Sequence, residues 1–149
     1  MIVKRGRFEF NNVIGLKVNS NAKDWIKHMA ILKAAIVAND VCSTGPIIIQ
    51  GNLNQEVSEA NEAILYAPIH REVELVGDNK DFFFSKRLVV EDTLKVRHTE
   101  LEDDIDATEK FLELIAAKNK LRLKKPYYYV YLPVYQDYVI DIWAEIEKE

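Results

Sequence analysis

The chain has 149 residues, of which 48% are hydrophobic and 30% are charged, and its formal net charge is −4 at pH 7. This length suits one domain with a sizeable core, and the composition excludes disordered, collagen-like and low-complexity chains. The 24 acidic residues outnumber the 20 basic ones, which disfavours non-specific nucleic-acid binding. We therefore expect a single domain over residues 1–149 and no nucleic-acid partner.

The sequence also narrows the cellular compartment and the chemistry. No apolar run approaches the roughly 20 residues of a membrane span, and no apolar segment follows the charged residues near the N-terminus. Cys42 is the only cysteine, which excludes an internal disulfide and a cysteine-rich metal site. The three histidines lack the spacing of metal ligands. We expect a cytoplasmic protein with no membrane contact, no metal and no cofactor.

The first half predicts a strand, a helix and two further strands. Apolar residues alternate over residues 8–18, interrupted by Asn12, which is typical of a half-buried strand. Apolar residues at positions 25, 29, 32 and 36 predict an amphipathic helix that ends near Asp40. Residues 47–49 predict a short buried strand, and residues 63–75 predict another that bends at Pro68.

The second half repeats this order. Alternation over residues 88–98, interrupted by Asp92, predicts a strand; a helix face follows between residues 101 and 115, and strands are predicted at 127–134 and 139–146. A shift of 80 residues places Phe8 on Leu88 and Pro46 on Pro126. The pattern predicts an internal duplication of a β-α-β-β unit, with repeat 1 at about 7–76 and repeat 2 at about 86–148.

These elements predict an α+β fold. Two β-α-β-β repeats side by side give a mostly antiparallel sheet of about six strands, with two helices on one face and pseudo-two-fold symmetry. The opposite face is expected to be left partly open or concave. The seam between the repeats is then the natural place for a ligand.

Three stretches, residues 8–16, 94–100 and 139–146, resemble the gyrase-inhibitor-like (GyrI-like) effector-binding domains. The first runs into a Val-Ile-Gly-Leu step, and the last carries Asp141 followed by Trp143. This bacterial family binds small molecules and is related to the SOUL haem-binding proteins. The resemblance implies the same fold, a stand-alone bacterial member and a ligand-binding role.

Period-two alternation assigns a set of aromatic and polar residues to the open face of the sheet. These candidate ligand-binding residues are Tyr66, His70, Tyr129, Tyr131, Asp141 and Trp143. Aromatic rings offer area and cation–π attraction, and a carboxylate offers a countercharge, so an amphipathic ligand that is cationic or planar is expected. We further expect tyrosine hydroxyls to solvate Asp141 in the empty protein, so that Asp141→Asn leaves the fold intact.

Two other functions remain open at this level. The same aromatic residues could form the contact surface of an inhibitor or accessory protein that binds another protein, and a homodimer is also compatible with the sequence. A hydrolase is the third alternative, because some members of the resembled family hydrolyse small molecules. No Gly-x-Ser-x-Gly elbow is present, and we assign no catalytic residue. A non-enzymatic small-molecule-binding domain is the first interpretation.

Overall fold

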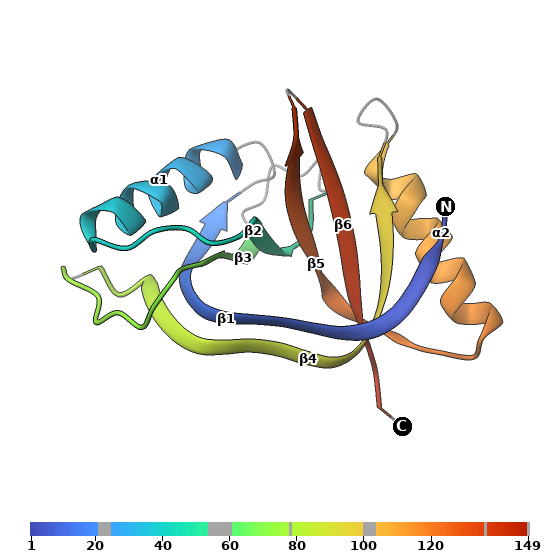
Figure 1. Cartoon of the computed structure of the whole chain (residues 1–149). Coiled ribbons are helices and arrows are strands. Elements are labelled where there is room, and N and C mark those ends of the chain that lie inside the picture. The colour runs from blue at the N-terminus through green and yellow to red at the C-terminus, as the bar shows by residue number, and fades with distance from the viewer. Residues whose placement is uncertain (21–24, 54–60, 78, 100–103, 136, 149) are drawn as a thin grey trace.

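The computed structural model describes residues 1–20, 25–53, 61–77, 79–99, 104–135 and 137–148. Both halves have the element order β-α-β-β, so the chain is α+β as the sequence predicts (Figure 1). The elements are β1 (Val3–Ser20), α1 (Trp25–Ala38), β2 (Ile47–Gly51), β3 (Asn61–Pro68), β4 (Phe82–His98), α2 (Ile105–Lys118), β5 (Leu123–Val134) and β6 (Asp137–Ile146).

The sheet is antiparallel, but it closes into a barrel instead of staying open. Its strand order is β1-β3-β2-β5-β6-β4, and β4 pairs back with β1. Closure depends on the length of β1 and β4, which have 18 and 17 residues and pair with each other from Val3–Val96 to Leu16–Phe82. In Figure 1 these two strands run side by side beneath β5 and β6. The face opposite the helices is therefore the inside of a barrel, so the expectation that it stays partly open is wrong, whereas a concave face agrees with the closure.

An irregularity at Asn12 turns β1 over partway along its length. Asn12 has a left-handed φ of 52°, a conformation that asparagine tolerates better than most residues. Before it, Phe8 packs in one core cluster; after it, Ile14 and Leu16 pack in another. The sequence placed all of these apolar residues on one face, which is wrong because the irregularity changes the phase of the alternation.

Strand β4 changes face in the same way. Gly6 pairs with Thr93 and Phe8 pairs with Val90, so β4 carries one extra residue between these two pairs. As a result Val90 and Leu94 lie in different core clusters. The bend that accompanies such a bulge helps β4 to curve around the barrel.

The duplication itself stays a prediction. The two polar interruptions, Asn12 and Asp92, are 80 residues apart and both lie near a change of face. Pro46 directly precedes β2, whereas Pro126 lies inside β5, directly before Tyr127, where the pairing of β5 with β2 begins. Superposition of the two β-α-β-β halves is the comparison that tests it.

Two hydrophobic clusters separate the two faces of the barrel wall. The larger cluster joins α1, through Trp25 and Leu32, and α2, through Leu112, to one face of the strands. The smaller one, the inner cluster, has only strand residues among those the structure describes. Its buried members are Phe8, Val13, Ile48, Tyr66, Val90, Tyr128 and Val130. Phe8 of β1 meets Tyr128 of β5 although these strands are not neighbours, so the inner cluster fills the barrel interior.

Within the described part of the chain, neither helix has the length and apolar character that crossing a bilayer requires.

Candidate functional site

Strand registers arrange the side chains of the inner face, the face that carries the inner cluster, in two rows across the barrel wall. The first row reads Arg97, Asp141, Val130, Ile48, Tyr66, Gly15 and Phe83. The second row reads Lys95, Trp143, Tyr128, Gln50, Ile64 and Lys17. The first row therefore has Arg97 at one end, the second has a lysine at each end, and both contain aromatic rings.

Aromatic rings pack the middle of the barrel. The Phe8 ring centroid lies 4.9 Å from that of Tyr128, 5.3 Å from that of Trp143 and 5.3 Å from that of Phe10. At these distances the rings are in contact, and edge-on or tilted arrangements of this kind are favourable. The middle of the inner face is thus a filled core, and any ligand site on this face must lie toward an end of the barrel.

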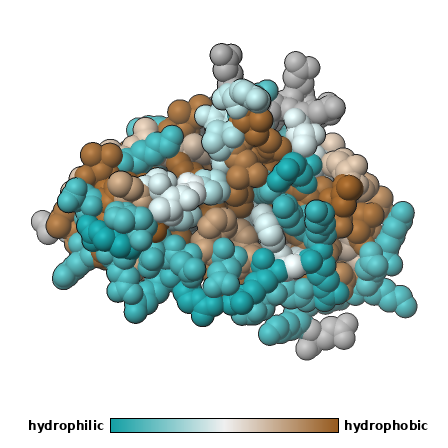
Figure 2. Space-filling model, in the orientation of Figure 1, coloured by the Kyte–Doolittle hydropathy of each residue, from teal (hydrophilic) through white to brown (hydrophobic). Residues whose placement is uncertain are grey.

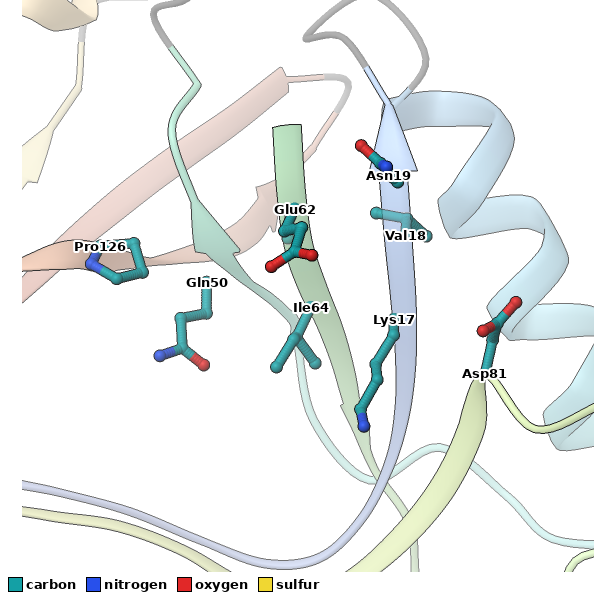
Figure 3. A pocket seen from close by; sticks show the side chains of 9 residues that line it. Lys17, Val18, Asn19, Gln50, Glu62, Ile64, Asp81 and Pro126 are labelled. Carbon is teal, nitrogen blue, oxygen red and sulfur yellow. The ribbon is translucent and has the colours of Figure 1, made fainter. Parts of the chain in front are cut away.

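One end of the second row opens into a cavity of about 690 Å³, here called the mouth pocket. Its walls come from β1, β2, β3 and β5, and Figure 3 shows Lys17, Gln50 and Ile64 reaching toward it from three neighbouring strands. The remaining lining residues are Val18, Asn19, Glu62, Ala63, Asp81 and Pro126. The volume lies within the range of small-molecule sites, roughly 300–1,000 Å³.

Two polar side chains at the mouth pocket, Gln50 and Lys17, contact aromatic residues of the inner face. The Tyr66 hydroxyl donates to Gln50 Oε1 at 3.0 Å, which leaves the amide NH₂ of Gln50 available to a ligand. Lys17 Nζ lies 5.6 Å from the centroid of the Phe83 ring, and the Lys17 backbone N–H donates to the Asp81 carbonyl at 2.9 Å.

The charges of the mouth pocket are mixed. Lys17 is its one basic lining residue among those described, and Glu62 and Asp81 are its acids. Glu62 lies two residues before Ile64 on β3, so alternation puts its carboxylate on the inner face, whereas Asp81 lies on the other side of β1 in Figure 3. Glu62 is therefore the acid best placed to meet a bound cation.

Three of the residues chosen from sequence share the inner face. Tyr66 is buried in the inner cluster and Trp143 packs against it. Asp141 pairs with Val130 of the inner cluster, which puts it on the same face. The structure thus brings Tyr66, Trp143 and Asp141 onto the face that the alternation assigned to them.

The face assigned to Tyr129 and Tyr131 is wrong. Both tyrosines belong to the helix-covered side, where the Tyr129 hydroxyl donates to Glu109 of α2. The register pairs Tyr128, not Tyr129, with Trp143. Alternation holds within β5 and within β6, but the phase between these two strands was shifted by one residue.

His70 lies away from this site. It is exposed, follows the end of β3, and its Nδ1 accepts a hydrogen bond of 3.1 Å from the Cys42 backbone N–H. It belongs to neither hydrophobic cluster. We find no contact that links it to Tyr66 or Trp143 in the described residues.

The contacts of the Asp141 carboxylate are with two cations and not with tyrosine hydroxyls. Arg97 donates to it twice, from Nε at 2.7 Å and from Nη2 at 3.0 Å, and Lys95 Nζ lies 3.4 Å from its Oδ2. The same Lys95 Nζ lies 5.2 Å from the centroid of the Trp143 ring. The ion pair with Asp141 also raises the pKa of the Arg97 guanidinium. The expectation of a carboxylate waiting for a cationic ligand is wrong.

Sequence reasoning missed the residues that line the mouth pocket. Lys17, Gln50 and Glu62 have no motif around them, and they come together only through the pairing of β1, β3 and β2. One signal was available: Glu62 lies directly before the predicted strand that contains Tyr66 and is four residues from it, so alternation places both on one face once the strand is extended by one residue.

The buried tyrosines predict a loss of stability at high pH. Burial raises the pKa of Tyr66 and of Tyr131 to about 12, and the neighbouring Tyr128 adds to the shift of Tyr66. Above pH ~10 the unfolded chain loses these protons while the native state keeps them, so the free energy of unfolding falls as pH rises. The stabilisation is complete below about pH 10 and is lost toward pH ~12, at up to roughly 2–3 kcal/mol for each tyrosine.

Circular dichroism and tyrosinate absorbance, followed together through this pH range, test the prediction. We expect unfolding to coincide with ionisation of the buried tyrosines, and Tyr66→Phe to make the pH dependence shallower. Smooth ionisation of every tyrosine near pH 10 in a protein that stays folded would contradict it.

Comparisons with known proteins support the fold. No family model matches the chain, and no curated protein matches it in sequence. Among solved structures, the crystal structure of the EcmrR C-terminal domain matches with a TM-score of 0.70 at 13% identity over 100% of both chains. EcmrR in the cryo-EM structure of the EcmrR–DNA complex in EcmrR-RPo matches with a TM-score of 0.73 at 15% identity, over 99% of this chain.

The chain spans 58% of the length of EcmrR in that DNA complex. A hydrolase from Listeria innocua also matches, with a TM-score of 0.65 at 10% identity over 97% of this chain and 92% of the other. Identities this low show a shared fold. That fold is consistent with the gyrase-inhibitor-like resemblance seen in the sequence.

Proposed function

We propose that this protein is a non-enzymatic member of the gyrase-inhibitor-like effector-binding domains that binds a small amphipathic organic molecule at its mouth pocket. The single observation that carries the proposal is the cavity of about 690 Å³ at the end of the aromatic inner face. The fold likeness to the EcmrR C-terminal domain and the three resembling stretches support the family assignment.

The lining of the pocket indicates the kind of ligand. Ile64 and Pro126 offer apolar contact area, and the Gln50 amide offers two donors. Glu62 is exposed and has no ion-pair partner among the described residues, so a cationic group on the ligand can pair with it. A planar molecule with a positive end fits these groups best. Its positive end would lie at Glu62, and not at Asp141 as the sequence predicted.

Glu62→Gln tests this proposal. In calorimetric titrations with a panel of planar cations and their neutral isosteres, we expect the variant to weaken cation binding roughly fivefold and leave the neutral isosteres unchanged. Ile64→Ala should weaken both classes, because it removes apolar area that both would contact. Glu74→Gln is the matched control, since Glu74 is exposed and lies outside the pocket lining.

Two outcomes would redirect the proposal. Appearance of a hydrolysis product by mass spectrometry during these titrations would favour the hydrolase alternative. Absence of binding by every panel member to the wild-type protein would contradict the small-molecule proposal.

An exposed apolar surface on α1 favours the protein-interaction alternative. Ile26 and Val37 are 82% and 78% exposed, and both lie on one flank of α1, beside the face that buries Leu32 and Ile36. Figure 2 shows hydrophobic residues interleaved with hydrophilic ones over this helix. Self-association of the wild type in light scattering, abolished by Ile26→Glu, would support a homodimer through α1.

A further inference from the structure

A second pocket lies at the opposite end of the second row from the mouth pocket and carries the opposite charge. It has a volume of about 440 Å³, and Lys4, Lys95 and Arg97 line it together with Ile2, Thr99 and Met1. Alternation along β1 and β4 puts these basic residues on the inner face, next to Asp141 and Trp143. We call this cavity the basic pocket.

The basic pocket has an excess of positive charge. Asp141 is the one carboxylate in contact with Lys95 and Arg97, and none contacts Lys4, as far as the described residues show, so the three basic side chains exceed it by two positive charges. The Asp141 side chain is 5% exposed, while that of Arg97 is 50% exposed. The carboxylate therefore lies beneath the cations, and the outer side of the cations is available to solvent or to a ligand.

Lys4 and Lys95 are held in an unfavourable arrangement. They are direct partners in the antiparallel register of β1 and β4, which brings the Cβ atoms of such a pair to within roughly 4.5–5.5 Å. Like charges placed directly opposite each other destabilise a sheet. Lys95 is drawn toward Asp141 and Trp143, but Lys4 has no ion-pair partner among the described residues. An anion bound between the two lysines would remove the repulsion.

We propose that the basic pocket binds a compact dianion, such as the phosphate group of a small phosphate monoester. Two unmatched positive charges select a dianion over a monoanion. The two ammonium groups provide rotatable donors, and Arg97 keeps Nη1 for the ligand because Nε and Nη2 bind Asp141. This site is separate from the mouth pocket, and its ligand chemistry is the reverse of that predicted from Asp141 in the sequence.

Fluorine NMR of the protein labelled with 5-fluorotryptophan provides a local readout. The chain has two tryptophans. The ring of Trp143 lies beneath Lys95, whereas Trp25 is the first residue of α1 and is buried in the larger cluster. Trp25→Phe assigns the two signals. During titration with phenyl phosphate at constant ionic strength, we expect a saturable shift of the Trp143 signal alone. Methyl phenyl phosphate, a monoanionic diester of similar size, should bind more weakly.

Variants connect the shift to the proposed residues. Lys4→Met should weaken phenyl phosphate binding roughly fivefold, and it should fold normally because Lys4 does not contact Asp141. Lys95→Met should weaken binding at least as much. Lys33→Met, an exposed residue of α1, is the matched control and should bind as the wild type does.

Several results would overturn the proposal. They are an unmoved Trp143 signal at saturating phenyl phosphate, equal affinity for the monoester and the diester, and equal weakening by Lys4→Met and Lys33→Met. Each would show that no dianion site is built from Lys4, Lys95 and Arg97.

Discussion

Replacing Phe8 with alanine should lower the free energy of unfolding by about 4 kcal/mol, near the upper end of the range for core truncations. Phe8 is 1% exposed and its ring meets those of Phe10, Tyr128 and Trp143. Removal of the ring leaves a cavity that the barrel wall cannot readily collapse to fill, because strands hold it on every side. Urea denaturation followed by tryptophan fluorescence and circular dichroism measures the loss.

Phe10→Ala is the matched control for this prediction. Phe10 is only partly buried and packs at the margin of the same inner cluster, so its loss should be about half as large. Equal small losses for both variants would show that the inner cluster contributes little to stability. The inner face would then be a loosely filled ligand cavity and not a core.

The contrast between Phe8 and the mouth pocket explains where a ligand can bind in this fold. A sheet with one open face would offer its aromatic residues to a ligand, as the sequence suggested. Closure of β4 onto β1 instead encloses the aromatic residues of the inner face, where Phe8 and Tyr128 pack against each other. Ligand sites are left at the ends of the rows, where Lys17 and Lys95 lie.

The order of strands and helices could be predicted from the sequence because it depends on local periodicity. Trp25, Leu32 and Ile36 recur at helical spacing, and all three are buried on the core-facing side of α1. Closure of the barrel depends on a different kind of signal. The changes of face near Asn12 and Asp92 looked like polar interruptions of continuous strands. The change near Asp92 is a bulge, which differs from an interruption only in how many residues oppose the partner strand, whereas the change at Asn12 accompanies its left-handed φ without a shift of register.

The candidate site was harder to predict because it depends on the phase between strands. Strand β5 ends at Val134, β6 begins at Asp137, and Val134 pairs with Asp137, so the register of the hairpin follows from this turn. Tyr135 in the turn has a φ of 56°, a value usually found at glycine or asparagine. Without those residues the sequence did not mark the turn, and a shift of one residue exchanged Tyr128 for Tyr129.

Asp141→Asn should destabilise the protein by about 2 kcal/mol, whereas the sequence alone predicted no loss. The substitution leaves Arg97 and Lys95 without their shared carboxylate. An amide oxygen can accept one hydrogen bond from Arg97, but it cannot offset the repulsion between the two cations. We reduce the loss of about 3–5 kcal/mol typical of a fully buried pair because solvent reaches half of the Arg97 side chain.

The ion pair between Arg5 and Asp92 provides a control with the same geometry on the surface. Arg5 Nε and Nη2 donate to the two Asp92 oxygens at 2.8 and 2.7 Å, but the two side chains are 56% and 39% exposed. Asp92→Asn should therefore cost less than about 1 kcal/mol, and added salt should reduce that cost further. Thermal unfolding of both variants at low and high salt compares the two pairs. Equal losses in the two variants would show that burial does not strengthen the Asp141 pair. If both losses are also small, they would favour the expectation from sequence that Asp141→Asn leaves the fold intact.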